Sequence, residues 1–141
     1  MRCLSVTPLK CSSIWRTAPV GFVCDVPEFD NAVAVIESDL KAEVLLDNLN
    51  GIELRMGRSR DRGVQYSSRK IDLDIIDFGG QEFSSSTLIL PHPRAHLRHF
   101  VLLPLQEVAP DFRFKNRSES LDELIKNAPA EPVRLSSRLT L

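Results

Sequence analysis

The sequence lacks several features that mark specialised classes of protein. Its 141 residues contain only three cysteines, Cys3, Cys11 and Cys24, with no C-x-x-C spacing and no partner pattern of a zinc site. No apolar run approaches the length needed to cross a bilayer, and the first residues lack the apolar core of a signal peptide. We therefore expect a cytoplasmic protein with reduced thiols and no membrane partner.

An excess of charge of one sign is also lacking. Lysine and arginine contribute 18 residues and aspartate and glutamate 19, for a formal net charge of -1. This balance excludes a wholesale basic surface for nucleic acid. The composition, 43% hydrophobic and 26% charged, is typical of a soluble globular protein. The length fits one domain, which we place at residues 1–128, followed by a polar, loosely held tail at 129–141.

Three stretches rich in aliphatic and β-branched residues predict strands, at residues 3–15, 29–38 and 71–78. Gly79 and Gly80 turn the chain after the third stretch, and a short hairpin arm is expected at residues 81–90.

Helical spacing of apolar residues follows the second predicted strand. The apolar positions, four, three and four residues apart, are Leu45, Leu49, Ile52 and Met56. Ser38 and Asp39 are natural N-caps for this helix, which we expect to end near Gly57.

Two further helices are expected nearer the C-terminus, around residues 100–107 and after Ser120. The second begins with a capping box, in which Ser120 and Glu123 have the S-x-x-E spacing. Helices and strands in this order predict an α+β fold with a mainly antiparallel sheet.

An acidic pair interrupts the third predicted strand. The stretch from residue 68 reads S-R-K-I-D-L-D-I-I-D-F-G-G. Its aspartates need a reason to be there, because an unpaired carboxylate in a buried strand costs several kcal/mol of folding free energy. Side chains two residues apart in a strand point the same way, so Asp72 and Asp74 are expected to project together. Carboxylates presented in this way suit Mg²⁺, whose shell is completed by water and phosphate. The alternative is that both face solvent and pair with nearby Lys or Arg.

Basic residues precede and follow this acidic pair. Residues 57–70 read as a loop that carries Arg58, Arg60, Arg62, Arg69 and Lys70. Guanidinium groups match phosphate oxygens, so this loop is expected to contact a polyphosphate.

Three histidines, His92, His96 and His99, lie in H-P-R-A-H-L-R-H-F, too far from cysteine or acidic residues to favour zinc. Among these residues His92 and Arg98 are the better anion contacts. The residues alone therefore indicate a Mg²⁺-dependent phosphoryl or nucleotidyl transferase, and the P-loop pattern G-x-x-x-x-G-K-[ST] is absent.

The segment from Arg69 to Ile76, with arginine, two spacers and D-L-D-I-I, resembles the signature of the hydroxymethyl-dihydropterin pyrophosphokinases of folate biosynthesis. Four more segments agree in order and spacing: residues 12–21, 29–35, 52–60 and 90–110. The resemblance implies a ferredoxin-like α+β sandwich. It also implies an enzyme that transfers diphosphate from ATP to 6-hydroxymethyl-7,8-dihydropterin and releases AMP.

Roles for individual residues follow from the same resemblance. Asp72 and Asp74 would hold two Mg²⁺ ions and would act in catalysis together with Arg58 and Arg69. The resemblance implies that the nucleotide is contacted by Glu53, Arg60, Ile75, His92 and Arg98. It implies that the pterin is contacted by Thr17, Val20, Phe29, Asn31 and Phe100.

The residue types fit the pterin assignment in part. Asparagine is disfavoured within strands, so Asn31 needs a specific partner. Phe29 and Phe100 suit the faces of a flat ring, although aromatics of this kind are also common in cores.

Family members begin with a strand, a Gly-Ser-Asn turn and a helix, so the resemblance implies that this first β-α unit is missing here. Two alternatives stay open. One is a catalytically inactive, truncated remnant. The other is an unrelated Mg²⁺-dependent nucleotidyltransferase, whose acceptor would not require Asn31. The sequence makes no prediction of oligomeric state.

Overall fold

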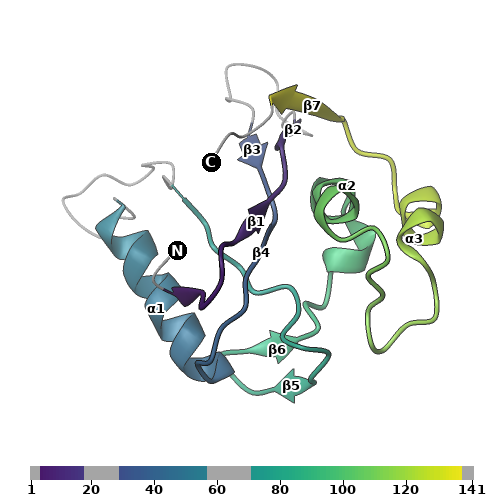
Figure 1. Cartoon of the computed structure of the whole chain (residues 1–141). Coiled ribbons are helices and arrows are strands. Elements are labelled where there is room, and N and C mark those ends of the chain that lie inside the picture. The colour runs from purple at the N-terminus through teal and green to yellow at the C-terminus, as the bar shows by residue number, and fades with distance from the viewer. Residues whose placement is uncertain (1–3, 18–28, 57–70, 138–141) are drawn as a thin grey trace.

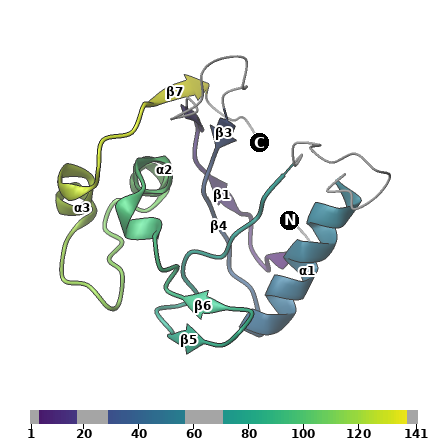
Figure 2. The same cartoon turned by 180° about the vertical axis from the view of Figure 1, so that it is seen from behind.

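Helices flank a central set of short strands in the computed structural model, which describes residues 4–17, 29–56 and 71–137. The helix α1 lies on one side of the strands, and α2 and α3 lie on the other (Figures 1 and 2). The strands are β1 (Lys10–Cys11), β2 (Ile14–Thr17), β3 (Phe29–Asn31), β4 (Ala34–Val35), β5 (Phe83–Ser84), β6 (Ile89–Leu90) and β7 (Val133–Ser137). The helices are α1 (Ala42–Arg55), α2 (His99–Val108) and α3 (Leu121–Asn127), with a short 3-10 helix, η2 (Ala95–Leu97). The predicted α+β fold is confirmed.

Every strand pair in the described part of the chain is antiparallel. β2 lies between β3 and β7, and β1 pairs with β4. β5 and β6 form the predicted hairpin arm, which follows the Gly79 and Gly80 turn. Both glycines have positive φ values, 59° and 73°, a conformation that favours residues without a Cβ atom. None of the described helices has the length and apolar character required to span a membrane.

The C-terminal segment corrects one prediction. We expected a loose tail from residue 129, but β7 pairs with β2, so that Leu135 lies opposite Trp15. The segment V-R-L-S-S carries only a weak strand pattern on its own. The open edge of β2 supplies the hydrogen-bonding partner that the local sequence does not reveal.

Residues 71–78 are not a strand, contrary to the sequence prediction, because no described strand pairs with them. Other groups bind their backbone: the Leu73 N–H donates to Glu53 Oε2 at 2.5 Å, and the Ile76 carbonyl accepts from the His92 N–H at 2.9 Å. The predicted alternation nevertheless holds. Asp72 and Asp74 are exposed, and the aliphatic residues beside them are half-buried.

The start of α1 also differs from the prediction. Its N-cap is Lys41, whose side chain makes no capping hydrogen bond, and not Ser38 or Asp39. Ser38 Oγ instead accepts a hydrogen bond from the Leu40 N–H at 3.2 Å, in a turn that precedes the helix. The helix therefore begins later than its most favourable capping residues.

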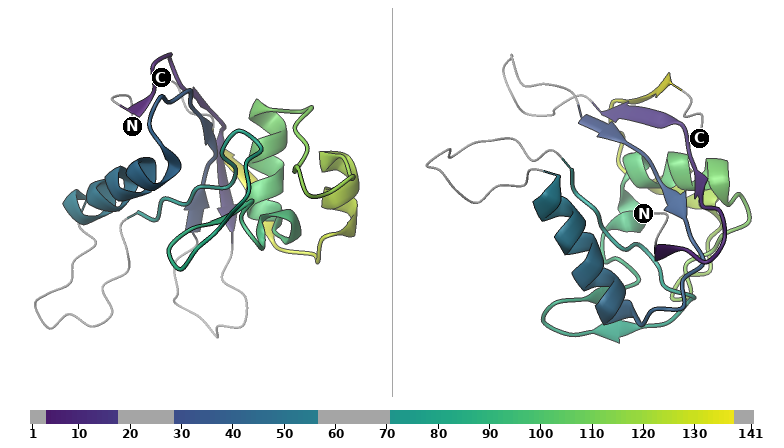
Figure 3. Two further views of the ribbon diagram at one scale, coloured as in Figure 1. Left: turned by 90° about the horizontal axis from the view of Figure 1, so that it is seen from below. Right: turned by 60° about the vertical axis from the view of Figure 1, so that its left-hand side comes forward.

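Three groups of buried side chains form the core of the described part of the chain. One joins η2, α2 and α3 and consists of Ala95, Leu102, Leu105, Phe114, Leu121 and Leu124. A second group lies against α1 and consists of Leu4, Leu45 and Leu49, and a third joins the start of α1 to the hairpin and consists of Ala42, Leu88 and Leu90. The segment 71–78 passes between the first group and the other two, since Ile75 contacts the α1 side and Ile76 the α2 side. The left panel of Figure 3 shows from below that this segment runs between α1 and α2.

The carboxylate of Glu107, near the end of α2, joins this helix to the strands. It accepts hydrogen bonds from the Ser13 N–H at 2.9 Å, from Ser13 Oγ at 2.6 Å and from Trp15 Nε1 at 3.1 Å. Since Trp15 pairs with Asn31 in the sheet, Glu107 fixes the strand beside Asn31 as well as the helix.

Glu107→Ala should lower the free energy of unfolding by about 1–3 kcal/mol, because three donors lose a charged acceptor. Glu107→Gln should cost less, since its amide oxygen still accepts two of these bonds. Urea denaturation measures both effects, with Glu82→Ala as a control at an exposed position outside this network. Equal stability of the Glu107→Ala and Glu82→Ala variants would contradict the role of this carboxylate.

Candidate functional site

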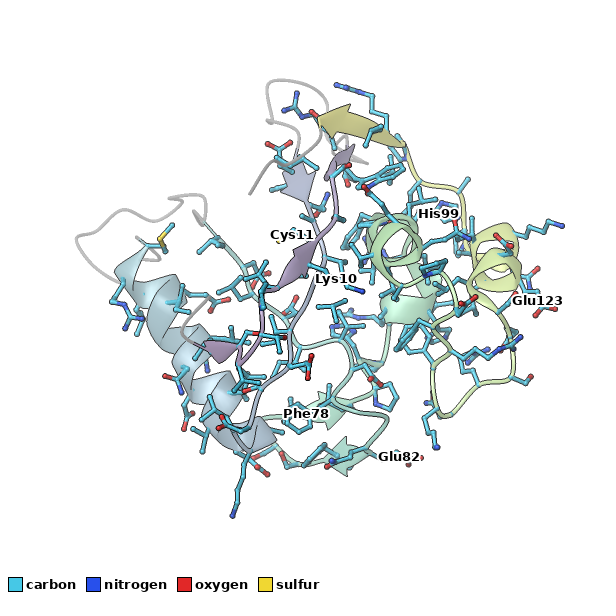
Figure 4. The ribbon with its side chains drawn as sticks, viewed as in Figure 1. Lys10, Cys11, Phe78, Glu82, His99 and Glu123 are labelled. Atoms are coloured by element: carbon cyan, nitrogen blue, oxygen red, sulfur yellow. The ribbon has the colours of Figure 1, made fainter. Side chains whose placement is uncertain are left out.

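A large cavity lies between the strand side of the fold and the segment 71–79. Its volume is about 840 Å³, and its walls include side chains of α1 and α2 together with Asn31, Asp74 and Phe100. Cys11 and Phe78, labelled in Figure 4, mark its wall along β1 and its wall near the hairpin. A cavity of this size is in the range that holds a small organic ligand.

A second, smaller cavity of about 250 Å³ lies beside the hairpin arm. Asp74, His92 and Thr87 are among the residues that line it. Asp74 and Ile75 line both cavities, so these two residues lie where the cavities meet. A ligand in each cavity would therefore approach the other at Asp74.

The side chain of Asn31 has a fixed orientation. Its Nδ2 donates to the carbonyl oxygens of Trp15 and Phe29, at 3.2 and 3.3 Å, and to Thr17 Oγ1 at 2.7 Å. Carbonyl oxygens only accept, so the nitrogen must face them. No described residue donates to Asn31 Oδ1, which leaves an acceptor at the wall of the large cavity. Thr17 thus supports Asn31 and does not itself line the cavity.

The two phenylalanines of the sequence prediction lie in different places. Phe100, in the first turn of α2, lines the large cavity, and the guanidinium carbon of Arg98 lies 4.4 Å from the centre of its ring. Phe29 is 55% exposed on β3 and does not line that cavity. The structure therefore brings Phe100 and Asn31 together and leaves Phe29 outside.

Asp74 presents an oxygen ligand where the two cavities meet, and Asp72, two residues before it, lines neither of them. Both are exposed, while Leu73 between them packs toward α1, so the two carboxylates share one side of the segment. The described residues contain no cluster of three or more His, Cys, Asp or Glu that would suit a metal bound wholly by protein. A pair of hard carboxylate ligands fits Mg²⁺, which keeps water and phosphate in its shell.

Glu53 has a structural partner in this site. It is 2% exposed on α1 and accepts the hydrogen bond from the Leu73 N–H, between the two aspartates. A carboxylate buried in this way requires hydrogen bonds, and this one holds the backbone that carries Asp72 and Asp74.

The three histidines of the 92–100 motif have different environments. His92 Nδ1 accepts from the Arg94 N–H at 3.2 Å, so the neutral ring carries its proton on Nε2 and offers a donor there. His99 Nε2 donates to the Ile125 carbonyl at 2.9 Å and joins α2 to α3. Burial lowers the pKa of His96, and the nearby charge of Arg117 lowers this pKa further although Glu119 opposes it. These separate partners do not form a zinc site.

Several residues at these cavities were not anticipated from the sequence. Ser86 and Thr87 at the hairpin tip line the small cavity. Asp77 lines the large one, and its Oδ1 is buried without a hydrogen-bond partner among the described residues. For Ser86 and Thr87, the only indication in the sequence was the run of hydroxyl residues between the two hairpin strands. Four predicted site residues, Val20, Arg58, Arg60 and Arg69, lie outside the described residues.

Comparison with known proteins gives a consistent match. The family model described as 7,8-dihydro-6-hydroxymethylpterin-pyrophosphokinase (HPPK) matches residues 2–110. The chain is similar to proteins named 2-amino-4-hydroxy-6-hydroxymethyldihydropteridine pyrophosphokinase. The relative from Haemophilus influenzae is 40% identical over 82% of this chain and 69% of its own length. The relative from Pseudomonas aeruginosa is 39% identical over 94% of this chain and 76% of its own length. The relative from Bacillus subtilis is 37% identical over 84% of this chain and 70% of its own length.

Asn31→Asp should lower the free energy of unfolding by about 1–3 kcal/mol, because a carboxylate oxygen would replace the donor that faces two carbonyl groups. Thermal or urea unfolding measures the change. Asn48→Asp is the matched control, since Asn48 Nδ2 donates to one carbonyl, that of Val44, at an exposed position. Full stability of Asn31→Asp would mean that the amide has the opposite orientation.

Proposed function

Since the chain belongs to the 7,8-dihydro-6-hydroxymethylpterin-pyrophosphokinase family, we propose that it transfers diphosphate from ATP to 6-hydroxymethyl-7,8-dihydropterin and releases AMP. The observation that carries this proposal is the position of Asp74, which lines both cavities. Two ligands must meet for group transfer, and the negative charge of the transferred phosphates must be neutralised where they meet. A carboxylate at that junction can hold the Mg²⁺ that neutralises this charge. We further propose that the reaction takes place in the cytoplasm.

The pterin occupies the large cavity in this proposal. Asn31 Oδ1 accepts a hydrogen bond from an N–H group of the ring, because its amide nitrogen is already fully used. Phe100 stacks on one face of the ring. Thr17 acts through Asn31, because Thr17 Oγ1 accepts a hydrogen bond from Asn31 Nδ2. Phe29 and Val20 are assigned to the pterin by resemblance alone, and Phe29 would have to cover the ring from its exposed position.

The nucleotide occupies the small cavity. Ile75 supplies apolar contact, and the Nε2–H of His92 donates to a phosphate oxygen. Arg98, at the start of α2, lines neither cavity and is assigned to the triphosphate by resemblance. Glu53 positions the aspartate segment through its hydrogen bond to the Leu73 N–H. Arg58, Arg60 and Arg69 complete the phosphate contacts in this proposal, which for these three residues rests on the sequence motif.

The hydroxymethyl oxygen of the pterin attacks the β-phosphorus of ATP, and the bond between this phosphorus and the oxygen that bridges to the α-phosphate breaks. The diphosphate passes to the pterin, AMP leaves with the bridging oxygen, and the hydroxyl proton is released. Asp72 and Asp74 would hold two Mg²⁺ ions, which when bound neutralise phosphate charge. The residues of the two cavities hold the oxygen and phosphorus in line.

AMP release by the purified 141-residue chain tests the proposal directly. With ATP and Mg²⁺, AMP should appear only when 6-hydroxymethyl-7,8-dihydropterin is added, and Asn31→Ala should suppress it. AMP release that persists unchanged in Asn31→Ala would favour an unrelated nucleotidyltransferase. A folded chain that releases no AMP would favour the inactive remnant.

Asp74→Asn should abolish Mg²⁺-dependent binding of ATP and leave the free energy of unfolding within about 0.5 kcal/mol of the original, because the side chain is exposed. Calorimetric titration and urea denaturation measure the two quantities. Asp47→Asn, at an exposed position of α1, is the control and should bind ATP normally. A destabilised Asp74→Asn variant with intact binding would show a structural role instead.

A further inference from the structure

Glu131 lies between α3 and β7 and contacts the start of α2. Its Oε2 lies 2.9 Å from Arg98 Nε, and its Oε1 accepts from the His99 N–H at 2.7 Å. The Glu131 side chain is only 14% exposed. This residue is outside the part of the chain that matches the family, residues 2–110, and in a segment expected from sequence to be loose.

The carboxylate supplies a cap that the local sequence does not provide. Arg98 is the N-cap residue of α2, and its side chain makes no capping hydrogen bond. The first N–H groups of a helix have no partner within the helix, and negative charge near them is favourable. Glu131 therefore satisfies the N–H of His99 from more than thirty residues away and fixes the first turn, which carries Phe100.

The same carboxylate orders the guanidinium of Arg98. It binds the Nε edge, and the guanidinium carbon lies over the Phe100 ring. The two terminal nitrogens of Arg98 make no hydrogen bond to the described residues, so they remain available as a two-pronged donor. One side of this planar group is thus held by the protein and the other is open to an anion.

We propose that Glu131 is a positioning residue that holds Arg98 in the orientation that binds the triphosphate of ATP. This inference rests on the proposed function. A free arginine side chain loses rotamer freedom when it binds phosphate, and a side chain that is already ordered avoids that loss. Glu131 acts through Arg98 and does not itself touch the nucleotide.

A double-mutant cycle on nucleotide binding tests the inference. The probe is α,β-methylene ATP, added together with Mg²⁺. A methylene group replaces the oxygen between its α- and β-phosphorus atoms, so the bond that breaks in the proposed reaction cannot be cleaved. Titration calorimetry gives the dissociation constant for the original chain, Glu131→Ala, Arg98→Ala and the double variant. Glu131→Ala should weaken binding about 3- to 10-fold, the loss expected for one side chain that must be ordered on binding. In the Arg98→Ala background, Glu131→Ala should have no further effect.

Two further variants separate positioning from folding. Glu131→Gln keeps a hydrogen-bond acceptor and a similar side-chain volume, so it should recover part of the affinity for the nucleotide. This variant keeps the inference testable if Glu131→Ala fails to fold. Glu119→Ala is the matched control, since Glu119 binds Arg117 at 3.1 Å away from both cavities and should leave binding unchanged.

Unchanged binding in Glu131→Ala, or an equal loss with and without Arg98, would overturn the inference and leave the proposed function intact. Failure of the original chain to bind the nucleotide would overturn both.

Discussion

A buried carboxylate, that of Glu53, holds the backbone between Asp72 and Asp74 against α1. This contact matters because residues 71–78 have no strand partner among the described residues and yet lie between the two helical layers. A second contact, from the His92 N–H to the Ile76 carbonyl, fixes the other end of the segment and joins it to the 92–100 motif. The position of both cavities relative to the aspartates follows from these two hydrogen bonds.

The site is built from elements that each bring one kind of group. β3 supplies the oriented amide of Asn31, α2 supplies Phe100, and the segment 71–78 supplies the carboxylates. Glu107 ties α2 to the strand beside Asn31, so the amide and the aromatic ring are held relative to each other. Binding groups on rigid elements that are joined in this way need little rearrangement when a ligand arrives.

Local patterns predicted some features of the fold correctly, although the start of α1 differs, since its N-cap is Lys41 and not Ser38 or Asp39. The capping box of Ser120 and Glu123 forms as expected, since both bonds lie within one helical turn. The strand at 71–78 and the loose tail were wrong because strand pairing depends on segments distant in sequence. The predicted alternation of exposed and half-buried side chains in this segment is nevertheless present. Leu73 and Ile75 pack against the core beside α1 although no strand pairs with the segment, and Asp72 and Asp74 beside them remain exposed.

The candidate site was predictable to a similar extent. Asn31 was assigned to the pterin by the family resemblance, and the separate expectation that an asparagine in a strand needs hydrogen-bond partners is met. Phe29 has the chemistry of a stacking residue, but its exposure depends on the pairing of β3 with β2, which composition does not reveal. Glu107 and Glu131 carried no local signal, because their partners lie up to 94 residues away in the sequence.

The locked amide of Asn31 also makes the proposed pterin site selective between tautomers. A rotatable amide accommodates either hydrogen-bond polarity, since it can exchange its oxygen for its nitrogen. Here that exchange would set Oδ1 against the carbonyl oxygens of Trp15 and Phe29, so the side chain can only accept from a ligand. If the ring nitrogen that faces Asn31 carries no proton, its lone pair lies against a lone pair of Asn31 Oδ1, with no water between them to bind either. Polar sites reject such mismatched ligands strongly.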